Sequence, residues 1–192
     1  VHNVLELKVL TIDGQWLTIG GRGLDSPGLD VLALMHGSEG LLGVIMEITV
    51  KLLPRPQVAR LVMAAFHSVE QAGMAVADIM AAGIVPGGLE MMDKMAVEVC
   101  GALCGAGYPV DAAALLLCEL DGNLAEVEAQ IAAVKAVMTS AGAYDLRIAK
   151  DETERLRFWA GRKAAFPAFG RIANDYFCMD GTIPRKHLAK VL

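Results

Sequence analysis

Residues 151–169 form the stretch in which side-chain types and spacing first suggest chemistry, because cations stand among aromatic residues there. Projected along a helix at about 100° per residue, the aromatic side chains share one broad face: Phe158, Trp159, Phe166 and Phe169. The cations fall within that face or beside it: Arg155, Arg162 and Lys163. A guanidinium in apolar surroundings needs a carboxylate partner, and its planar fork also fits the carboxylate of a small substrate.

Arg162 is the cation whose partner the sequence leaves open. No acidic residue of the same predicted helix lies one turn away from it. Substrate binding and a structural ion pair therefore remain equally open for Arg162. For Arg155 and Lys163, cation–π packing or snorkelling along the aromatic face is the simpler interpretation.

A second candidate is the loop "GSEGLLG", residues 37–43, which runs directly into β-branched residues that stop at Pro54 and Pro56. Glycine has no Cβ, so such a loop fits a tight entry into a strand. It equally fits a place where the backbone approaches a flat or phosphorylated ligand. Spacing alone does not decide between the two.

Neither a metal site nor a dinucleotide-binding loop is complete in this sequence. Cys100 and Cys104 would share a helix face, but no nearby histidine or second cysteine pair accompanies them, so we expect buried thiols. The four histidines stand at no ligand spacing. The glycines of residues 20–23 lack the strand–GxGxxG–helix context of a Rossmann fold.

Composition narrows the class of protein. The net charge of −5 gives no basic footprint for nucleic acid. Hydrophobic residues make up 55%, yet apolar runs such as residues 112–118 are far shorter than the roughly 18 residues that span a bilayer. The first residues lack the features of a signal peptide and open without Met inside a strand-like pattern, so we expect an internal piece of a longer chain.

The elements of residues 1–56 are predicted to be mostly β. Residues 1–19 alternate around Asp13–Gly14 as in a hairpin, and residues 20–30 are loop. A short helical segment and the glycine loop then lead into a strand over 43–53, and the prolines favour a domain boundary near residue 56.

Residues 57–150 predict two successive β-α-β units. Strands are expected at 60–66, 88–92, 113–121 and 145–149, and helices at 68–83, 93–104 and 124–142. Ser68 with Gln71, and Asn123 with Glu126, are typical of helix N-termini. The pattern indicates an α+β fold, a duplicated ferredoxin-like layer whose antiparallel sheet is covered by helices on one face. Beyond it we expect one helix over 151–169, a strand and turn over 175–184, and the start of a helix.

With these elements in place, longer motifs show a resemblance. "GSEGLLGVIMEITVKLLPRP" resembles the corresponding segment of FAD-linked oxidases of the vanillyl-alcohol oxidase type. Further stretches resemble the flavin-binding subunits of bacterial glycolate oxidases within that family: "LDSPGLDVLAL", "PGGLEMMD", "GYPVDAAALLLCELDG" and "ERLRFWAGRKAAFPAFGRIANDYFCMDGTIPR". The resemblance covers essentially the whole chain.

The resemblance implies roles for particular residues. Residues 1–56 would be the C-terminal part of an FAD-binding domain, and residues 57–192 a substrate, or cap, domain that is incomplete at its C-terminus. The implied FAD-binding residues are Gly37, Ser38, Glu39, Gly43, Val44 and Ile45. Arg162, with Lys163 beside it, would bind the substrate carboxylate. This chain has Cys178 where some relatives have a lysine, so no second anchoring cation is implied there.

The implied activity is oxidation of glycolate, or of a related D-2-hydroxy acid such as D-lactate, by a protein that works with other subunits, including an iron–sulfur subunit. The implied location is cytoplasmic, peripheral on the inner face of the bacterial membrane through the complex. The family's pyrophosphate loop is expected before Val1, and a divalent-metal region and the return into the FAD domain after Leu192. The competing interpretation is a non-catalytic ferredoxin-like module for assembly or binding.

Overall fold

The computed structural model describes residues 2–23 and 28–191. Contacts divide the chain into two units, Val1–Arg55 and Pro56–Leu192. Each unit has its own sheet, so each is described by itself.

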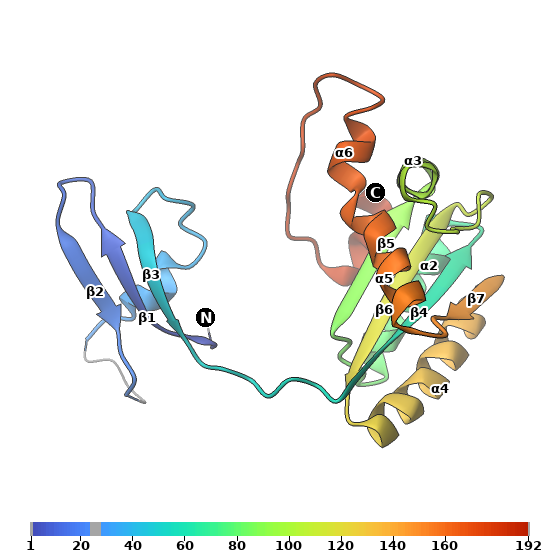
Figure 1. Ribbon diagram of the computed structural model, residues 1–192, viewed down its shortest axis with the longest axis horizontal. Helices are drawn as coiled ribbons and strands as arrows, with labels where there is room; N and C mark the ends of the chain where they lie inside the picture. The colour runs from blue at the N-terminus through green and yellow to red at the C-terminus, as the bar shows by residue number, and fades with distance from the viewer. Residues whose placement is uncertain (1, 24–27, 192) are drawn as a thin grey trace. The chain divides into compact units, whose positions relative to one another are not determined.

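Unit 1 is a three-stranded antiparallel sheet with one short helix (Figure 1). Its elements are β1 (Val4–Leu10), β2 (Trp16–Gly20), α1 (Val31–Met35) and β3 (Val44–Val50), with the strands in the order β2-β1-β3. The predicted hairpin and short helix are confirmed, whereas β3 ends at Val50 instead of residue 53. Part of the loop expected over 20–30 lies outside the described residues.

Unit 2 is built on a four-stranded sheet in the order β5-β6-β4-β7, and every neighbouring pair is antiparallel. Its first elements are β4 (Val58–Phe66), α2 (Val69–Ala81), β5 (Gly88–Asp93), α3 (Lys94–Cys104), β6 (Ala114–Gly122), α4 (Leu124–Ser140) and β7 (Asp145–Ile148). After them come α5 (Glu152–Lys163), α6 (Ala165–Phe169), a 3-10 turn (Arg185–His187) and α7 (Leu188–Val191). The predicted α+β class and the two β-α-β units are therefore confirmed, and so is the predicted helix over 93–104, which is α3 between β5 and β6.

Side chains cap the helices of unit 2 as the sequence predicts. The Oγ of Ser68 accepts from the N–H of Gln71 at 3.2 Å, and Asn123 Oδ1 accepts from the N–H of Glu126 at 2.9 Å. The return bond from Gln71 differs from a full capping box, because its Oε1 accepts from the N–H of His67 at 3.2 Å. The caps fix where α2 and α4 begin.

Helices cover both faces of the unit 2 sheet, so the expectation of one covered face is wrong. On one face, β4 and β6 bury alternate residues against α2 and α4, including Phe66, Leu116 and Leu120. On the other face, the intervening residues, among them Met63 and Leu117, pack against α3, α5 and α6 (Figure 1). A central strand that is buried on both sides carries a continuous apolar run instead of an alternating one.

The expected single helix over 151–169 is two helices, α5 and α6, which meet at Ala164. Pro167 explains the break, because its ring would clash with the carbonyl of Lys163 one turn earlier and it has no N–H to donate. In α6 the proline lies in the first turn, where it is tolerated. The expected shared aromatic face is also wrong, since Phe158 is buried in the core while Phe166 is 59% exposed.

The strand expected over 175–184 is also wrong. Residues 174–182 are exposed and form no strand, and neither β5 nor β7 gains a neighbour from them. Residues of high β-propensity form a strand only where one face can be buried, and residues 174–182 bury none. The predicted helix start after Pro184 is present as the 3-10 turn and α7, which packs against α2.

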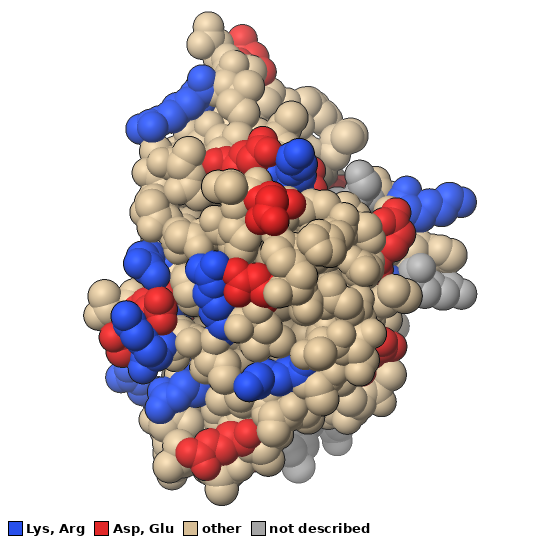
Figure 2. Space-filling model, turned by 90° about the vertical axis from the view of Figure 1, so that its right-hand side faces the viewer, with Lys and Arg blue, Asp and Glu red and all other residues tan. Residues whose placement is uncertain are grey.

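Charge is intermixed on the face of the molecule shown in Figure 2, where basic and acidic side chains alternate over a largely uncharged surface. Within the described residues, no helix is both long and apolar enough to cross a bilayer.

Candidate functional site

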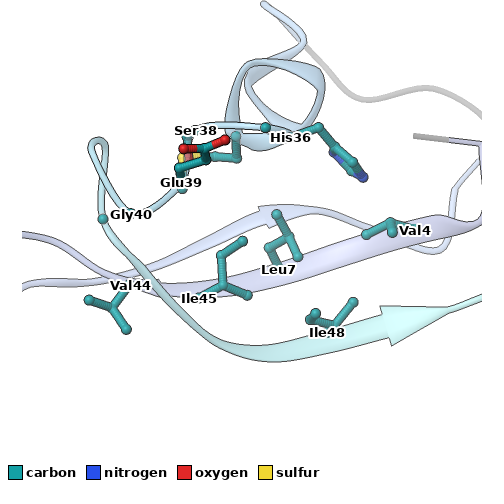
Figure 3. Close-up of a pocket in the computed structure, with 12 residues that line it drawn as sticks. Val4, Leu7, His36, Ser38, Glu39, Gly40, Val44, Ile45 and Ile48 are labelled. Atoms are coloured by element: carbon teal, nitrogen blue, oxygen red, sulfur yellow. The ribbon is translucent and has the colours of Figure 1, made fainter. Parts of the chain in front are cut away.

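The glycine loop of unit 1 closes one side of a pocket of about 380 Å³. Figure 3 shows the loop above and the strands β1 and β3 below, with Leu7, Ile45 and Ile48 forming an apolar floor. The β-bulge between Lys8 and Val9 changes the register, so that both Ile45 and Ile48 face the pocket. All six residues that the resemblance implies for FAD line this pocket: Gly37, Ser38, Glu39, Gly43, Val44 and Ile45.

Glycine is required for different reasons at the three glycine positions of the loop. Gly43 enters β3 so close to β1 that a Cβ there would lie 2.6 Å from Cγ1 of Val9. Gly37 and Gly40 have φ values of 74° and 81°, and a Cβ on either would meet nothing within 4 Å. The tight strand entry thus accounts for Gly43, and the left-handed φ accounts for Gly37 and Gly40.

Three polar side chains line the pocket, those of His36, Ser38 and Glu39, and His36 is the one that was not predicted. Glu39 is a predicted site residue, and its φ of 51° lies in the left-handed region. His36 was not predicted, because one histidine before a glycine carries no spacing signal. Its Nδ1 lies 2.9 Å from the carbonyl oxygen of Leu32, which can only accept, so Nδ1 carries the hydrogen and the neutral ring has Nε2 as an acceptor.

These residues fit part of a flavin cofactor. The floor is apolar, the loop carries no Cβ at two positions, and the volume lies within the range of small-molecule sites. A carboxylate at the rim disfavours a phosphate group there, since both are anions. The pocket is therefore suited to an uncharged part of FAD instead of its pyrophosphate.

In unit 2, Arg162 lies in the last turn of α5 and forms an ion pair within the chain. Its Nε donates to Glu90 Oε2 of β5 at 3.0 Å, and the two side chains are 36% and 41% exposed. In the described residues no further hydrogen bond engages the two terminal nitrogens of this guanidinium. Arg162 can thus make its structural ion pair through Nε and still present two donors to an anion.

Lys163, the other predicted substrate-binding residue, follows Arg162 in the same turn and is exposed. In the part of the chain that is described, its ammonium has no ion pair. Arg162 and Lys163 belong to unit 2, whereas the FAD candidates belong to unit 1.

Arg155 does not make the cation–π contact that we expected. Its guanidinium is paired with Glu119 of β6 and, at 2.7 Å, with Glu152 one turn earlier. Trp159 Nε1 also donates to Glu119, at 2.5 Å. These ion pairs and hydrogen bonds raise the pKa of Arg155, the bond to Glu152 being the largest cause. The side chain is thus fully engaged and is a structural element that fastens α5 to β6.

Tyr108 fixes the part of α5 that carries Arg162. Its hydroxyl donates to the carbonyl of Phe158, and a Cβ on Gly161 would lie 2.6 Å from Cζ of the tyrosine ring. Burial raises the pKa of Tyr108, so the hydroxyl stays protonated and can donate. Helix α5 can approach Tyr108 this closely because residue 161 is glycine.

The cysteines behave as buried thiols where they lie in the core. Burial raises the pKa of Cys118 to about 12 and also raises that of Cys100, so neither is an activated nucleophile. Within residues 2–23 and 28–191, no group of three or more His, Cys, Asp or Glu side chains is arranged to hold a metal ion.

Sequence comparisons relate the chain to flavoenzymes. Residues 55–192 match the family "FAD linked oxidases, C-terminal domain". The chain is 59% identical over all its 192 residues to glycolate oxidase subunit GlcD of Escherichia coli K12, and spans 38% of that protein. It is 32% identical to the Bacillus subtilis GlcD, with 98% of this chain and 40% of the relative covered. It is 29% identical to a probable mitochondrial D-lactate dehydrogenase of Danio rerio, with 87% and 34% covered.

Solved structures show the same fold at low sequence identity. An alkyldihydroxyacetonephosphate synthase aligns with a TM-score of 0.63 at 18% identity, over 88% of this chain and 34% of its own. A p-cresol methylhydroxylase with substrate bound aligns with a TM-score of 0.60 at 14% identity, over 82% and 37%. The family match over residues 55–192, which is more than half of the chain, shows that the chain belongs to the family of FAD linked oxidases, whose C-terminal domain it contains.

Proposed function

We propose that this chain is part of a flavin-dependent oxidoreductase that oxidises glycolate, or a related D-2-hydroxy acid such as D-lactate, to the 2-oxo acid. The observation that carries the proposal is the 59% identity, across the whole chain, to a glycolate oxidase subunit. The chain spans 38% of that relative, so the proposal concerns the activity of the whole protein. D-lactate remains in the proposal because D-lactate dehydrogenases are among the more distant relatives.

Residues 1–56 are assigned to the end of the FAD-binding domain, and residues 57–192 to the substrate domain. The pocket under the glycine loop supports the first assignment, because its apolar floor and open glycine positions suit a cofactor. FAD, when bound, accepts the two electrons that leave the substrate. The residues proposed to hold it are Gly37, Ser38, Glu39, Gly43, Val44 and Ile45.

Arg162 is proposed to bind and orient the substrate carboxylate. Its Nε is held by Glu90, and the side chain is 36% exposed, so the two terminal nitrogens are left to bind an anion as a fork. Lys163 adds a second positive charge in the same turn. Holding the carboxylate in one orientation fixes the position of the neighbouring hydroxyl-bearing carbon, at which oxidation occurs.

The wider assignments rest on the family resemblance of the sequence. We assign the whole protein to a complex with other glycolate oxidase subunits, an iron–sulfur subunit among them, on the cytoplasmic side of the bacterial membrane. A divalent metal, where the whole protein uses one, is assigned to a region other than these 192 residues. An isolated assembly module has no observation in its favour, since the family match and the pocket both point to a flavoenzyme.

The test is anaerobic reduction of the full-length protein. Purified with its cofactor, it should be yellow and should lose flavin absorbance when glycolate is added, with D-lactate and L-lactate as comparison substrates. A colourless full-length protein that takes up no FAD would contradict the cofactor assignment. A yellow protein that no 2-hydroxy acid reduces would contradict the substrate assignment alone.

A further inference from the structure

The hydroxyl of Tyr108 reaches the backbone of α5 at the turn that carries Arg162. It donates to the carbonyl oxygen of Phe158, and in an α-helix this oxygen is the acceptor for the N–H of the residue four positions later, which is Arg162. Burial raises the pKa of Tyr108, and the backbone N–H of Arg162 is close enough to its oxygen to lower it in part. The hydroxyl therefore lies at the backbone hydrogen bond that positions Arg162.

The chain is shaped for this contact on both sides of the hydroxyl. On the helix, position 161 is glycine, which is less favourable than alanine inside a helix, and a Cβ there would collide with the tyrosine oxygen. On the loop, Arg147 of β7 donates from Nη1 to the carbonyl of Gly107 at 3.0 Å, next to Tyr108. The tyrosine ring is buried in the core, so loop and core together fix where the hydroxyl lies.

The other contacts of α5 hold its earlier part or the guanidinium itself. Trp159 donates to Glu119 of β6, three residues before Arg162. Glu90 binds Nε of Arg162, but both side chains are partly exposed, so water competes with this ion pair. The contact of Tyr108 is the one of these that acts on the backbone of the last turn.

We propose that Tyr108 is a positioning residue for substrate binding, whose hydroxyl holds the last turn of α5 in the conformation in which Arg162 binds the carboxylate. This inference rests on the proposed function and adds to it a residue that acts through Arg162. Without the hydroxyl, the turn samples conformations that do not bind the anion, and the apparent affinity falls with the fraction of competent molecules. Bound substrate itself holds Arg162, so the rate of the oxidation step should not change.

Tyr108→Phe in the full-length enzyme keeps the buried ring and removes the hydroxyl. The KM for glycolate and the inhibition constant of oxalate should each rise by roughly 2- to 12-fold, which corresponds to the contribution of about 0.5–1.5 kcal/mol from one hydrogen bond. The kcat and the flavin absorbance should stay at the parental values. A hydroxyl with a purely structural role would lower the resistance to urea and leave the KM unchanged.

Tyr144→Phe is the matched control, because the hydroxyl of Tyr144 also makes a hydrogen bond, to Asp111 at 3.0 Å and not to α5. Its KM should equal that of the parent. Gly161→Ala disturbs the same contact without removing the hydroxyl, because the added Cβ displaces the tyrosine oxygen, and it should also raise the KM.

A double variant shows whether the tyrosine acts through the arginine. When Tyr108→Phe is added to Arg162→Met, the KM should not rise further, because the residue that the hydroxyl positions is already absent. A further rise overturns the inference.

The remaining outcomes separate the inference from the proposed function. An unchanged KM in Tyr108→Phe, or a lower kcat with an unchanged KM, overturns the inference while the proposed function stands. If Tyr108→Phe does not fold, an unchanged KM in Gly161→Ala overturns it in the same way. A parent enzyme that oxidises no 2-hydroxy acid overturns the proposed function, and the inference fails with it.

Discussion

Arg162 presents a guanidinium that is anchored at one edge and open at the other. Because Glu90 accepts only from Nε, replacement of the arginine should remove substrate binding without disturbing the core. Arg162→Met in the full-length enzyme is expected to keep the fold and the flavin. It should lower kcat/KM by roughly 10- to 150-fold, since a hydrogen bond to a charged group contributes about 1.5–3 kcal/mol. Steady-state kinetics with glycolate, beside the flavin absorbance of the purified variant, measures both.

The control for this variant must be an arginine of α5 outside the proposed site. Arg155 is unsuitable, because its side chain is 18% exposed and its loss would leave Glu119 without a cationic partner. Arg157 is 48% exposed and pairs with Glu154 on the same helix, so Arg157→Met should change kcat/KM little. Equal activity of the Arg162 variant and the parent would make Arg162 a structural residue.

Glu90 allows a second prediction, because its negative charge opposes the binding of an anion at Arg162. Glu90→Gln keeps an oxygen that accepts from Nε but removes the charge. The KM for glycolate should therefore fall, by up to roughly fivefold, since exposed ion pairs contribute about 0.2–1 kcal/mol. The KM and the inhibition constant of oxalate, compared at low and high salt, test this expectation, and a KM that rises would contradict it.

The sequence could not reveal Glu90 or Glu119 as partners of these arginines. Both acidic residues stand on strands, and Glu90 is separated by 72 positions from Arg162. A search for partners one turn away on the same helix therefore found none for Arg162. The sequence nevertheless indicated Arg162 as a candidate anion-binding residue, because its neighbours in the sequence are aromatic residues, alanine and glycine.

At the scale of elements, the position of α5 depends on how closely it approaches Tyr108. Gly161→Ala would place a Cβ 2.6 Å from the ring carbon Cζ, so the helix or the tyrosine must shift. Overpacking of this kind costs about 1–3 kcal/mol. Urea unfolding of the variant should show that loss, and kcat/KM should fall as well because Arg162 is the next residue in the helix.

Gly101 provides a matched control for Gly161, because it also lies within a helix and also faces Tyr108. A Cβ at this position would lie 3.6 Å from the tyrosine Cδ2, which is ordinary van der Waals contact. Gly101→Ala should therefore be neutral or should stabilise the protein by up to about 1 kcal/mol through helix propensity. If both variants lose the same stability, close approach is not the reason for Gly161.

Most elements were predictable because local signals determine them. Ser68 and Asn123 mark the beginnings of α2 and α4, and Asp13–Gly14 marks the hairpin. The second covered face of the unit 2 sheet was missed although the signal was present. The run over 113–118 is continuously apolar, which is typical of a strand buried on both sides, but helices on only one face were expected.

The break in the helix expected over 151–169 and the absence of the strand expected over 175–184 have different causes. Pro167 was visible in the sequence and its effect on Lys163 follows from backbone geometry. The exposed segment 174–182 could not be excluded as a strand from its own residues, because β-propensity depends on whether a neighbouring strand and a buried face exist. Glycine spacing left a strand entry and a ligand site equally open, and the resemblance implied the loop residues that line the pocket. His36 carries no spacing signal, so only the structure places it there.

At the scale of the whole molecule, the two units differ in how much core they contain. Among the described residues, unit 2 buries two clusters of sixteen and fourteen residues, one on each face of its sheet. Unit 1 buries three residues, Leu7, Val9 and Met35. The apolar residues of β3 remain largely uncovered in unit 1, with Val44 and Ile48 each 56% exposed.

This difference predicts that the units differ in independent stability. Residues 56–192 expressed alone should fold and unfold cooperatively in urea, because both faces of the sheet are covered within that unit. Residues 1–55 alone should lack a cooperative transition, since three buried side chains cannot offset the conformational entropy of about 55 ordered residues. Circular dichroism and the dispersion of amide NMR signals of the two pieces measure this. A well-dispersed spectrum and a cooperative transition for residues 1–55 would show that its strands are stable without further cover. That result would contradict the prediction that three buried side chains are too few for residues 1–55 to fold alone.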